Sequence, residues 1–215
     1  KQRCFLSLTG LTTMLTRVPM YRQTLDELRR GAKRAVTLPE AAKPFVLAAL
    51  AQQWGGPVVV LCPHPEDSRR LVELIQSYAD DGARIHHFAE SEVLPYERLS
   101  IEAGTVHERL AALGALHGLV GEDTAYPPVI VTSVTGLMQK TISPELLRST
   151  AGTIQRDDKL FVDQTLEQWA RMGYRVGPLV EEPGTAARRG DIIDIYGPGH
   201  ADPVRIDLWG NRVDT

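Results

Sequence analysis

The chain has 215 residues, of which 43% are hydrophobic and 24% are charged, and its formal net charge is −3. These values are typical of soluble globular domains and argue against a disordered chain, and the basic bias of a dedicated DNA-binding domain is missing. The two cysteines, Cys4 and Cys62, form no metal-ligand pattern and favour free thiols in a reducing compartment. Because apolar runs are short and no signal peptide is visible, we expect a cytoplasmic protein with no membrane partner.

The first part of the chain alternates between helical and strand patterns. Apolar spacing and stop signals predict a helix over residues 21–30. The elements predicted next are a strand at 34–37, a helix at 40–54, a strand at 57–62, a helix at 65–78, a strand at 84–88, a helix at 106–117, a strand at 128–132 and a helical turn at 136–140. Strands rich in valine and isoleucine, separated by helices, predict a parallel sheet. We therefore predict an α/β domain over residues 1–142.

The pattern changes beyond residue 143. A helix predicted at 163–172 is followed only by strands, at 174–180, 190–196 and 204–209. Closely spaced strands punctuated by glycine and proline predict an antiparallel sheet with a helix on one face. Residues 143–215 are therefore predicted to form a small α+β domain. Because the chain opens on Lys1 and stops just after a predicted Gly210-Asn211 turn, we expect a fragment whose second domain is truncated.

A helicase-like ATPase built on a parallel sheet needs a phosphate loop, GxxxxGK[ST], between a strand and its helix. The corresponding stretch here begins at Thr37 and ends at Pro44. Lys43 is present, but Thr37 and Ala42 stand at the glycine positions, where side chains obstruct the approach of phosphates to the backbone. Pro44 offers neither a hydroxyl for magnesium nor an N–H for a phosphate oxygen.

These departures predict a degenerate phosphate loop in a helicase-like domain. The sequence also lacks a DEAD-like acidic run that would hold magnesium. We expect no ATPase activity, no cofactor and no catalytic residue in this chain. A metal site built from Cys62, His64 and the His86-His87 pair is disfavoured, because neighbouring residues of a strand point to opposite faces.

Several segments, taken together, resemble a known module. LPYERLS at 94–100, HERLAALGAL at 107–116 and VIVTSVTGLMQK at 129–140 resemble the first domain shared by the excision protein UvrB and the transcription-repair coupling factor (Mfd) family. EEPGTAARRGDIIDIYGPG at 181–199 and PVRIDLWGNRVDT at 203–215 resemble the small second domain of that module. UvrB keeps a functional phosphate loop and a long aromatic β-hairpin that clamps DNA, and this sequence has neither. The chain is therefore similar to the amino-terminal UvrB-homology module of the coupling factors.

The resemblance implies a non-catalytic module that recruits UvrA for nucleotide excision repair where RNA polymerase has stalled at DNA damage. In the full-length protein a separate motor, which uses ATP and magnesium, translocates on double-stranded DNA and releases the polymerase. RNA polymerase and DNA would thus be partners of downstream domains. The resemblance also implies that Arg189, Arg205 and Trp209 contact UvrA, although the family often has phenylalanine at the last position.

Strand alternation supports part of this assignment independently. Along residues 204–209 it places the aliphatic side chains on one face and Arg205 and Trp209 on the other, with an aspartate between them. A tryptophan beside an arginine is the composition of an interface hot spot. The alternative is that Trp209 covers the hairpin turn, or that a bulge at Gly210 turns it into the core. Isoleucines on both faces of the Arg189 strand leave its exposed face undecided.

Neighbouring charged residues have simpler interpretations. Arg188 is a possible helper of Arg189. Asp191, Asp194 and Asp207 are interpreted as surface or arginine-paired carboxylates, and not as a catalytic cluster.

Two other function classes stay open. One is a divergent helicase-type ATPase that binds nucleotide by another route. The other is a UvrB-like module that binds damaged DNA, which is supported by a short basic stretch, namely Arg29, Arg30, Lys33 and Arg34. A solvated helix end is the simpler interpretation of that stretch.

Overall fold

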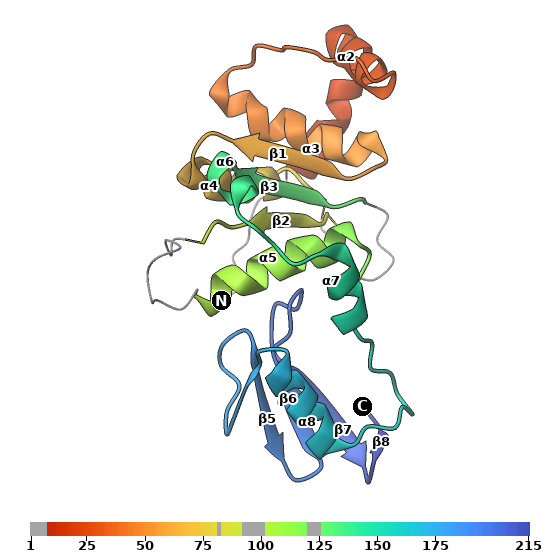
Figure 1. Cartoon of the computed structure of the whole chain (residues 1–215). Coiled ribbons are helices and arrows are strands. Elements are labelled where there is room, and N and C mark those ends of the chain that lie inside the picture. Colours follow the sequence, from red (N-terminus) through yellow and green to blue (C-terminus); the bar gives the residue numbers. More distant parts are fainter. Residues whose placement is uncertain (1–7, 81–82, 92–101, 120–125) are drawn as a thin grey trace. The chain divides into compact units, whose positions relative to one another are not determined.

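The computed structural model describes residues 8–80, 83–91, 102–119 and 126–215 (Figure 1). Contacts divide the chain into two compact units, residues 1–90 with 121–139, and residues 91–120 with 140–215. The predicted domains, residues 1–142 and 143–215, stay a prediction, because compactness does not test independent folding. Cys4 and the LPYERLS segment at 94–100 lie outside the described residues.

The first unit is an α/β structure with a three-stranded parallel sheet. Its helices are α1 (Thr9–Thr12), the 3-10 helix η1 (Thr13–Arg17), α2 (Pro19–Arg29), the 3-10 helix η2 (Glu40–Ala42), α3 (Lys43–Trp54), α4 (Pro65–Gln76) and α6 (Val134–Met138). Its strands are β1 (Val58–Cys62), β2 (Ile85–Phe88) and β3 (Val129–Ser133), in the spatial order β1-β3-β2. Both strand pairings are parallel, which confirms the predicted α/β class.

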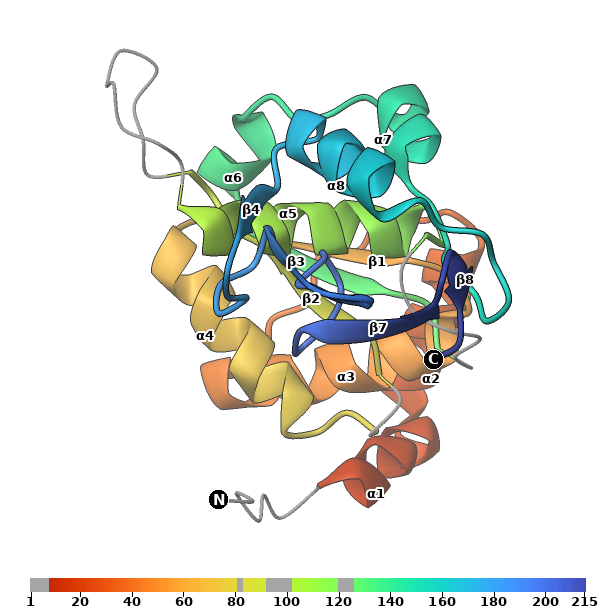
Figure 2. The ribbon, with the colours of Figure 1, turned by 90° about the horizontal axis from the view of Figure 1, so that it is seen from below.

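One face of this sheet is covered by α3 and α4, which contact each other (Figure 2). Ala48 of α3 and Ile75 of α4 pack there against Val129 and Val131 of the central strand. Burying such aliphatic side chains supplies the main favourable free energy of the fold. Gly55, with a φ of 80°, ends α3 in the left-handed conformation that glycine adopts without strain.

Strand β1 is an edge of the sheet, and among the described residues no strand pairs with its outer side. Two of its aliphatic side chains remain largely in solvent, since Val59 is 57% exposed and Leu61 is 49% exposed. Their register partners on β3 are Ile130 and Thr132, which alternate with the core residues Val129 and Val131. Val59 and Leu61 therefore point to the face of the sheet opposite α3.

The strand predicted at residues 34–37 was wrong. The structure has no regular element between residues 33 and 39, and Val36 is 48% exposed. Four residues carry too little alternation to distinguish a strand from an extended loop. The short helices α1 and η1 were not predicted either, because their polar threonines disguise the helical pattern.

In its described residues, the second unit combines three helices with a five-stranded sheet. The helices are α5 (Ala103–Leu116), α7 (Pro144–Thr150) and α8 (Val162–Arg171). The strands are β4 (Arg175–Gly177), β5 (Thr185–Arg189), β6 (Ile192–Ile195), β7 (Val204–Trp209) and β8 (Arg212–Val213), in that spatial order. Pairing between β4 and β5 is parallel, whereas the other pairings are antiparallel. The sheet is therefore mixed: the predicted antiparallel pairing is present from β5 to β8, but the prediction missed the parallel pairing of β4 with β5.

Helix α8 packs on one face of the mixed sheet and closes its core (Figures 1 and 2). The buried members of this core are Leu160, Val162, Ile193, Ile206, Leu208 and Val213. Two hairpins join β5 to β6 and β7 to β8, and each turns through a two-residue loop led by a glycine with a φ of 63°, Gly190 or Gly210. A positive φ at the first loop residue suits the right-handed twist of the flanking strands. The predicted Gly210-Asn211 turn is confirmed.

Within the part of the chain that the structure describes, no helix is long and apolar enough to cross a membrane.

Candidate functional site

The two faces of the mixed sheet differ in chemistry. Ile206 and Leu208 of β7 point into the core beneath α8. Alternation therefore directs Arg205 and Trp209 of the same strand to the opposite face. We call this second face of β5, β6 and β7 the outer face.

Strand register decides which other side chains share the outer face. Asp194 of β6 stands opposite Arg205 of β7, and Ile192 of β6 stands opposite Asp207. Arg189 of β5 pairs in turn with Ile192. Cross-strand partners point to the same side of a sheet. The structure thus brings Arg189, Arg205 and Trp209 together on the outer face, although sequence alternation alone left the side of Arg189 undecided.

Trp209 is a large hydrophobic side chain of this face that lies almost wholly in solvent. Its exposed fraction is 86%, so the indole neither covers the hairpin turn nor enters the core. The neighbouring residue Gly210 begins the two-residue loop without turning Trp209 inward. A tryptophan this exposed is unusual, because large aromatic side chains are normally well buried.

Arg205 is held against the sheet by a two-bond ion pair. Its Nε donates to Oδ1 of Asp194 at 2.7 Å, and its Nη2 donates to Oδ2 at 3.0 Å. These hydrogen bonds hold the pKa of Asp194 below its usual range against the opposing effect of burial, and the positive charge of Arg189 lowers it further. The same contact raises the pKa of Arg205. Asp194 is therefore an arginine-paired carboxylate, as the sequence suggested.

The two arginines of β5 lie on different faces. Arg189 donates from Nη2 to the Pro178 carbonyl at 3.3 Å. Arg188 pairs in register with the core residue Ile193, so it points to the α8 side. There its Nη1 donates to Oδ1 of Asp163 at 2.6 Å. Arg188 is thus not positioned to assist Arg189 on the outer face.

The stretch that aligns with a phosphate loop has ordinary local structure. Thr37 lies in the irregular segment before η2, and Ala42 ends η2. Lys43 begins α3, and its ammonium group is paired with the carboxylate of Glu40. Pro44 is buried in the first turn of α3, where a proline costs no helical hydrogen bond.

The histidines and Cys62 of the first unit do not form a cluster. Cys62 is buried, and burial raises the pKa of its thiol. Nε2 of His87 lies 3.0 Å from Oγ of the buried Ser68, a partner that the sequence did not suggest. Burial lowers the pKa of His86. Over the described ranges, no three histidine, cysteine or carboxylate side chains gather closely enough to hold a metal ion.

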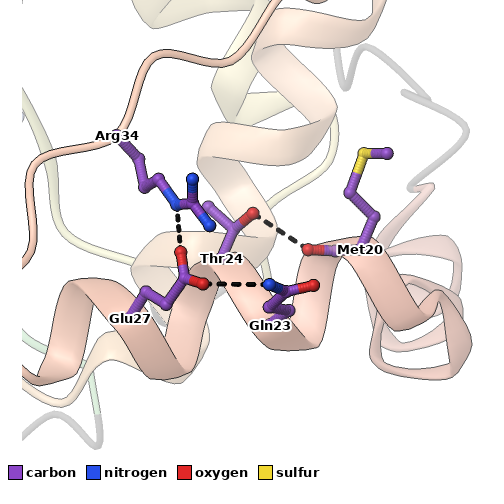
Figure 3. A network of polar contacts seen from close by, with 5 residues as sticks. All are labelled: Met20, Gln23, Thr24, Glu27 and Arg34. Atoms are coloured by element: carbon purple, nitrogen blue, oxygen red, sulfur yellow. Dashed lines mark hydrogen bonds and ion pairs between the residues drawn. The ribbon is translucent and has the colours of Figure 1, made fainter.

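The basic stretch at the end of α2 is partly engaged in contacts within the unit. Figure 3 shows Arg34 and Gln23 both directed at the carboxylate of Glu27. Arg29 donates from Nη2 to the Gln53 carbonyl at 2.6 Å. These contacts fit the interpretation as a helix end better than a free surface for DNA.

Comparisons with known proteins bear on the family of the chain and on the domain that contains this face. Residues 153–215, which contain the whole mixed sheet, match the family model for the UvrB interaction domain. The chain therefore combines a segment that matches the UvrB interaction domain with a parallel α/β unit.

The relatives define the protein more closely. Over 91% of its length the chain is 31% identical to the transcription-repair-coupling factor of Myxococcus xanthus, and over 91% it is 29% identical to that of Escherichia coli (strain K12). It is also 23% identical, over 81% of its length, to the UvrABC system protein B of Methanosphaera stadtmanae, of which it covers 28%. The chain is a homologue of the transcription-repair-coupling factors, and it spans 16% of the length of the first two relatives.

Proposed function

We propose that this chain is the amino-terminal UvrB-homology part of a transcription-repair coupling factor, and that it recruits UvrA in nucleotide excision repair. The outer face of the mixed sheet is the binding surface. The observation that carries this proposal is Trp209, which is 86% exposed on the same sheet face as Arg205, within the residues that match the UvrB interaction domain.

The chemistry of this face suits protein recognition. Tryptophan and arginine dominate interface hot spots, and truncating such an anchor typically costs about 2 kcal/mol or more of binding free energy. Arg189 and Arg205 add hydrogen-bond donors that a carbonyl or carboxylate of the partner can accept. Neither role requires a catalytic group or a bound cofactor.

The first unit is proposed to be a helicase-like domain whose phosphate loop no longer binds nucleotide. Support comes from Thr37, Ala42 and Pro44, which stand where a phosphate loop has its two glycines and its hydroxyl residue. The ammonium group of Lys43 also forms an ion pair with the carboxylate of Glu40. We therefore propose that the chain has no ATPase activity. In the full-length protein, ATP and magnesium would act at a separate DNA-translocating motor that releases RNA polymerase in the cytoplasm.

Calorimetric titration of UvrA into the purified chain tests the recruiting role. We expect the parent to bind and the double variant Arg205→Ala, Trp209→Ala to lose binding while keeping its circular dichroism spectrum. Arg171→Ala is a matched control, because Arg171 is an exposed arginine of α8 that pairs with Glu167 away from the outer face. No binding by the parent would refute the proposal, and equal binding by the double variant would move the interface elsewhere.

A further inference from the structure

We propose that Asp194 is a positioning residue of the outer face: its carboxylate holds the Arg205 guanidinium in one orientation, ready for the partner. The inference rests on the proposed recruitment of UvrA through this face.

The geometry of the pair fixes the arginine. Asp194 and Arg205 are direct register partners on the neighbouring strands β6 and β7. The two hydrogen bonds, of 2.7 and 3.0 Å, use both carboxylate oxygens and one edge of the guanidinium plane. Side-on pairing of this kind restricts rotation of the planar group. The N–H groups on the other edge remain available to an acceptor on a partner.

The two side chains of the pair differ in how far they are buried. The Asp194 side chain is only 16% exposed, whereas that of Arg205 is 59% exposed. The carboxylate therefore lies deep in the sheet surface and the guanidinium lies above it. A partner that approaches the outer face meets Arg205 and cannot easily displace the acid beneath it.

The position of Asp194 on β6 also relates it to both arginines. Arg205 contacts it directly from β7, and the charge of Arg189 on β5 acts on it through space. One carboxylate thus offsets the repulsion between two cations that must share a small face. Without it, Arg205 would lose the two hydrogen bonds that orient it, whereas Arg189 would keep its bond to the Pro178 carbonyl.

An immobilised arginine favours binding because less rotamer freedom is lost when the complex forms. Ordering one long side chain at an interface corresponds to about a two- to ten-fold change in affinity. We therefore expect Asp194→Asn to weaken UvrA binding by about this factor, mainly through faster dissociation.

The test is a double-mutant cycle on the whole chain, with affinity and dissociation rate for UvrA measured by surface plasmon resonance. The four proteins are the parent, Asp194→Asn, Arg205→Ala and the double variant. We expect Asp194→Asn to weaken binding in the parent and to have no further effect once Arg205 is removed. Asp163→Asn is the matched control, because Asp163 also pairs with an arginine, Arg188, but on the α8 side.

A second substitution separates charge from position. Asp194→Glu keeps the negative charge but moves the carboxylate outward by one methylene group, so a positioning role predicts weaker binding here too. Thermal unfolding of every variant confirms that the proteins are folded at the assay temperature.

Each remaining outcome decides between the two proposals. An equal loss from Asp194→Asn with and without Arg205, or an unchanged affinity while Arg205→Ala still weakens binding, overturns the positioning role and leaves the recruiting role intact. Failure of the parent to bind UvrA overturns the recruiting role itself.

Discussion

Replacing Trp209 by alanine should separate binding from folding. With 86% of the side chain in solvent, its truncation removes almost no intramolecular packing, so the free energy of unfolding should change by no more than about 0.5 kcal/mol. If a partner buries the exposed part of the indole, the area removed from water is on the order of 150–200 Å². At about 25 cal/mol per Å² this corresponds to an upper limit of about 4–5 kcal/mol of binding free energy.

The binding loss should therefore lie between about 2 and 5 kcal/mol, or roughly thirty- to several-thousand-fold in Kd. Fluorescence offers a direct assay, since an exposed indole should shift its emission to shorter wavelength when UvrA covers it. Trp169 provides the contrast, because it packs against the core of the same unit and its replacement by alanine should lower the unfolding free energy. A marked loss of stability in Trp209→Ala, or a UvrA affinity equal to that of the parent, would refute the reasoning.

Three further predictions concern the core, the ion pair and the phosphate-loop stretch. Ile193 is 0% exposed, so Ile193→Ala should lower the unfolding free energy by about 3 kcal/mol in urea denaturation, and a change below about 1 kcal/mol would contradict the packing described. Because the folded-state pKa of Asp194 is depressed below 3.8, its stabilising effect should be present above that pH and be lost as the pH falls through the folded-state value. The difference in unfolding free energy between the parent and Asp194→Asn should accordingly shrink on acidification. A difference that grows as the pH falls would contradict a depressed pKa of Asp194 in the folded state. Magnesium and ATP should leave the Tm of the chain unchanged, whereas a rise that saturates with nucleotide concentration would reveal a working site.

The strands with strong aliphatic patterns could be located closely from the sequence. The run predicted at 57–62 became β1 at Val58–Cys62, and the one at 204–209 coincides with β7. In both segments the burial of aliphatic side chains and the preference of β-branched residues for strands favour the same structure. The local preference for a strand and the burial of the side chains agree in these segments, so the residue pattern alone located both strands.

Strand β5 shows why the sheet type could not be predicted. Its sequence, TAARR, contains one β-branched residue and has little intrinsic preference for a strand. The segment becomes a strand because neighbours pair with both of its edges, with β4 parallel and β6 antiparallel. Such pairing depends on the tertiary structure, so the pattern of the five residues alone does not predict it.

The outer face was predictable in part. Gly190 and Asp191 form a two-residue loop, and such a loop fixes the register that places Arg189 opposite Ile192. The sequence therefore contains a signal for the side of Arg189 that strand alternation alone does not give. The pairing of Asp194 with Arg205 could not be predicted in the same way, because the longer connection between β6 and β7 does not fix their register.

The unpaired side of β1 has a practical consequence for work with this chain. Among the described residues no strand pairs with this edge, and an edge of this kind, flanked by the exposed side chains of Val59 and Leu61, can pair with the same edge of another molecule. Purified material should therefore self-associate as its concentration rises. Val59→Lys would introduce a charge that opposes this edge-to-edge pairing, at a site remote in sequence from the mixed sheet.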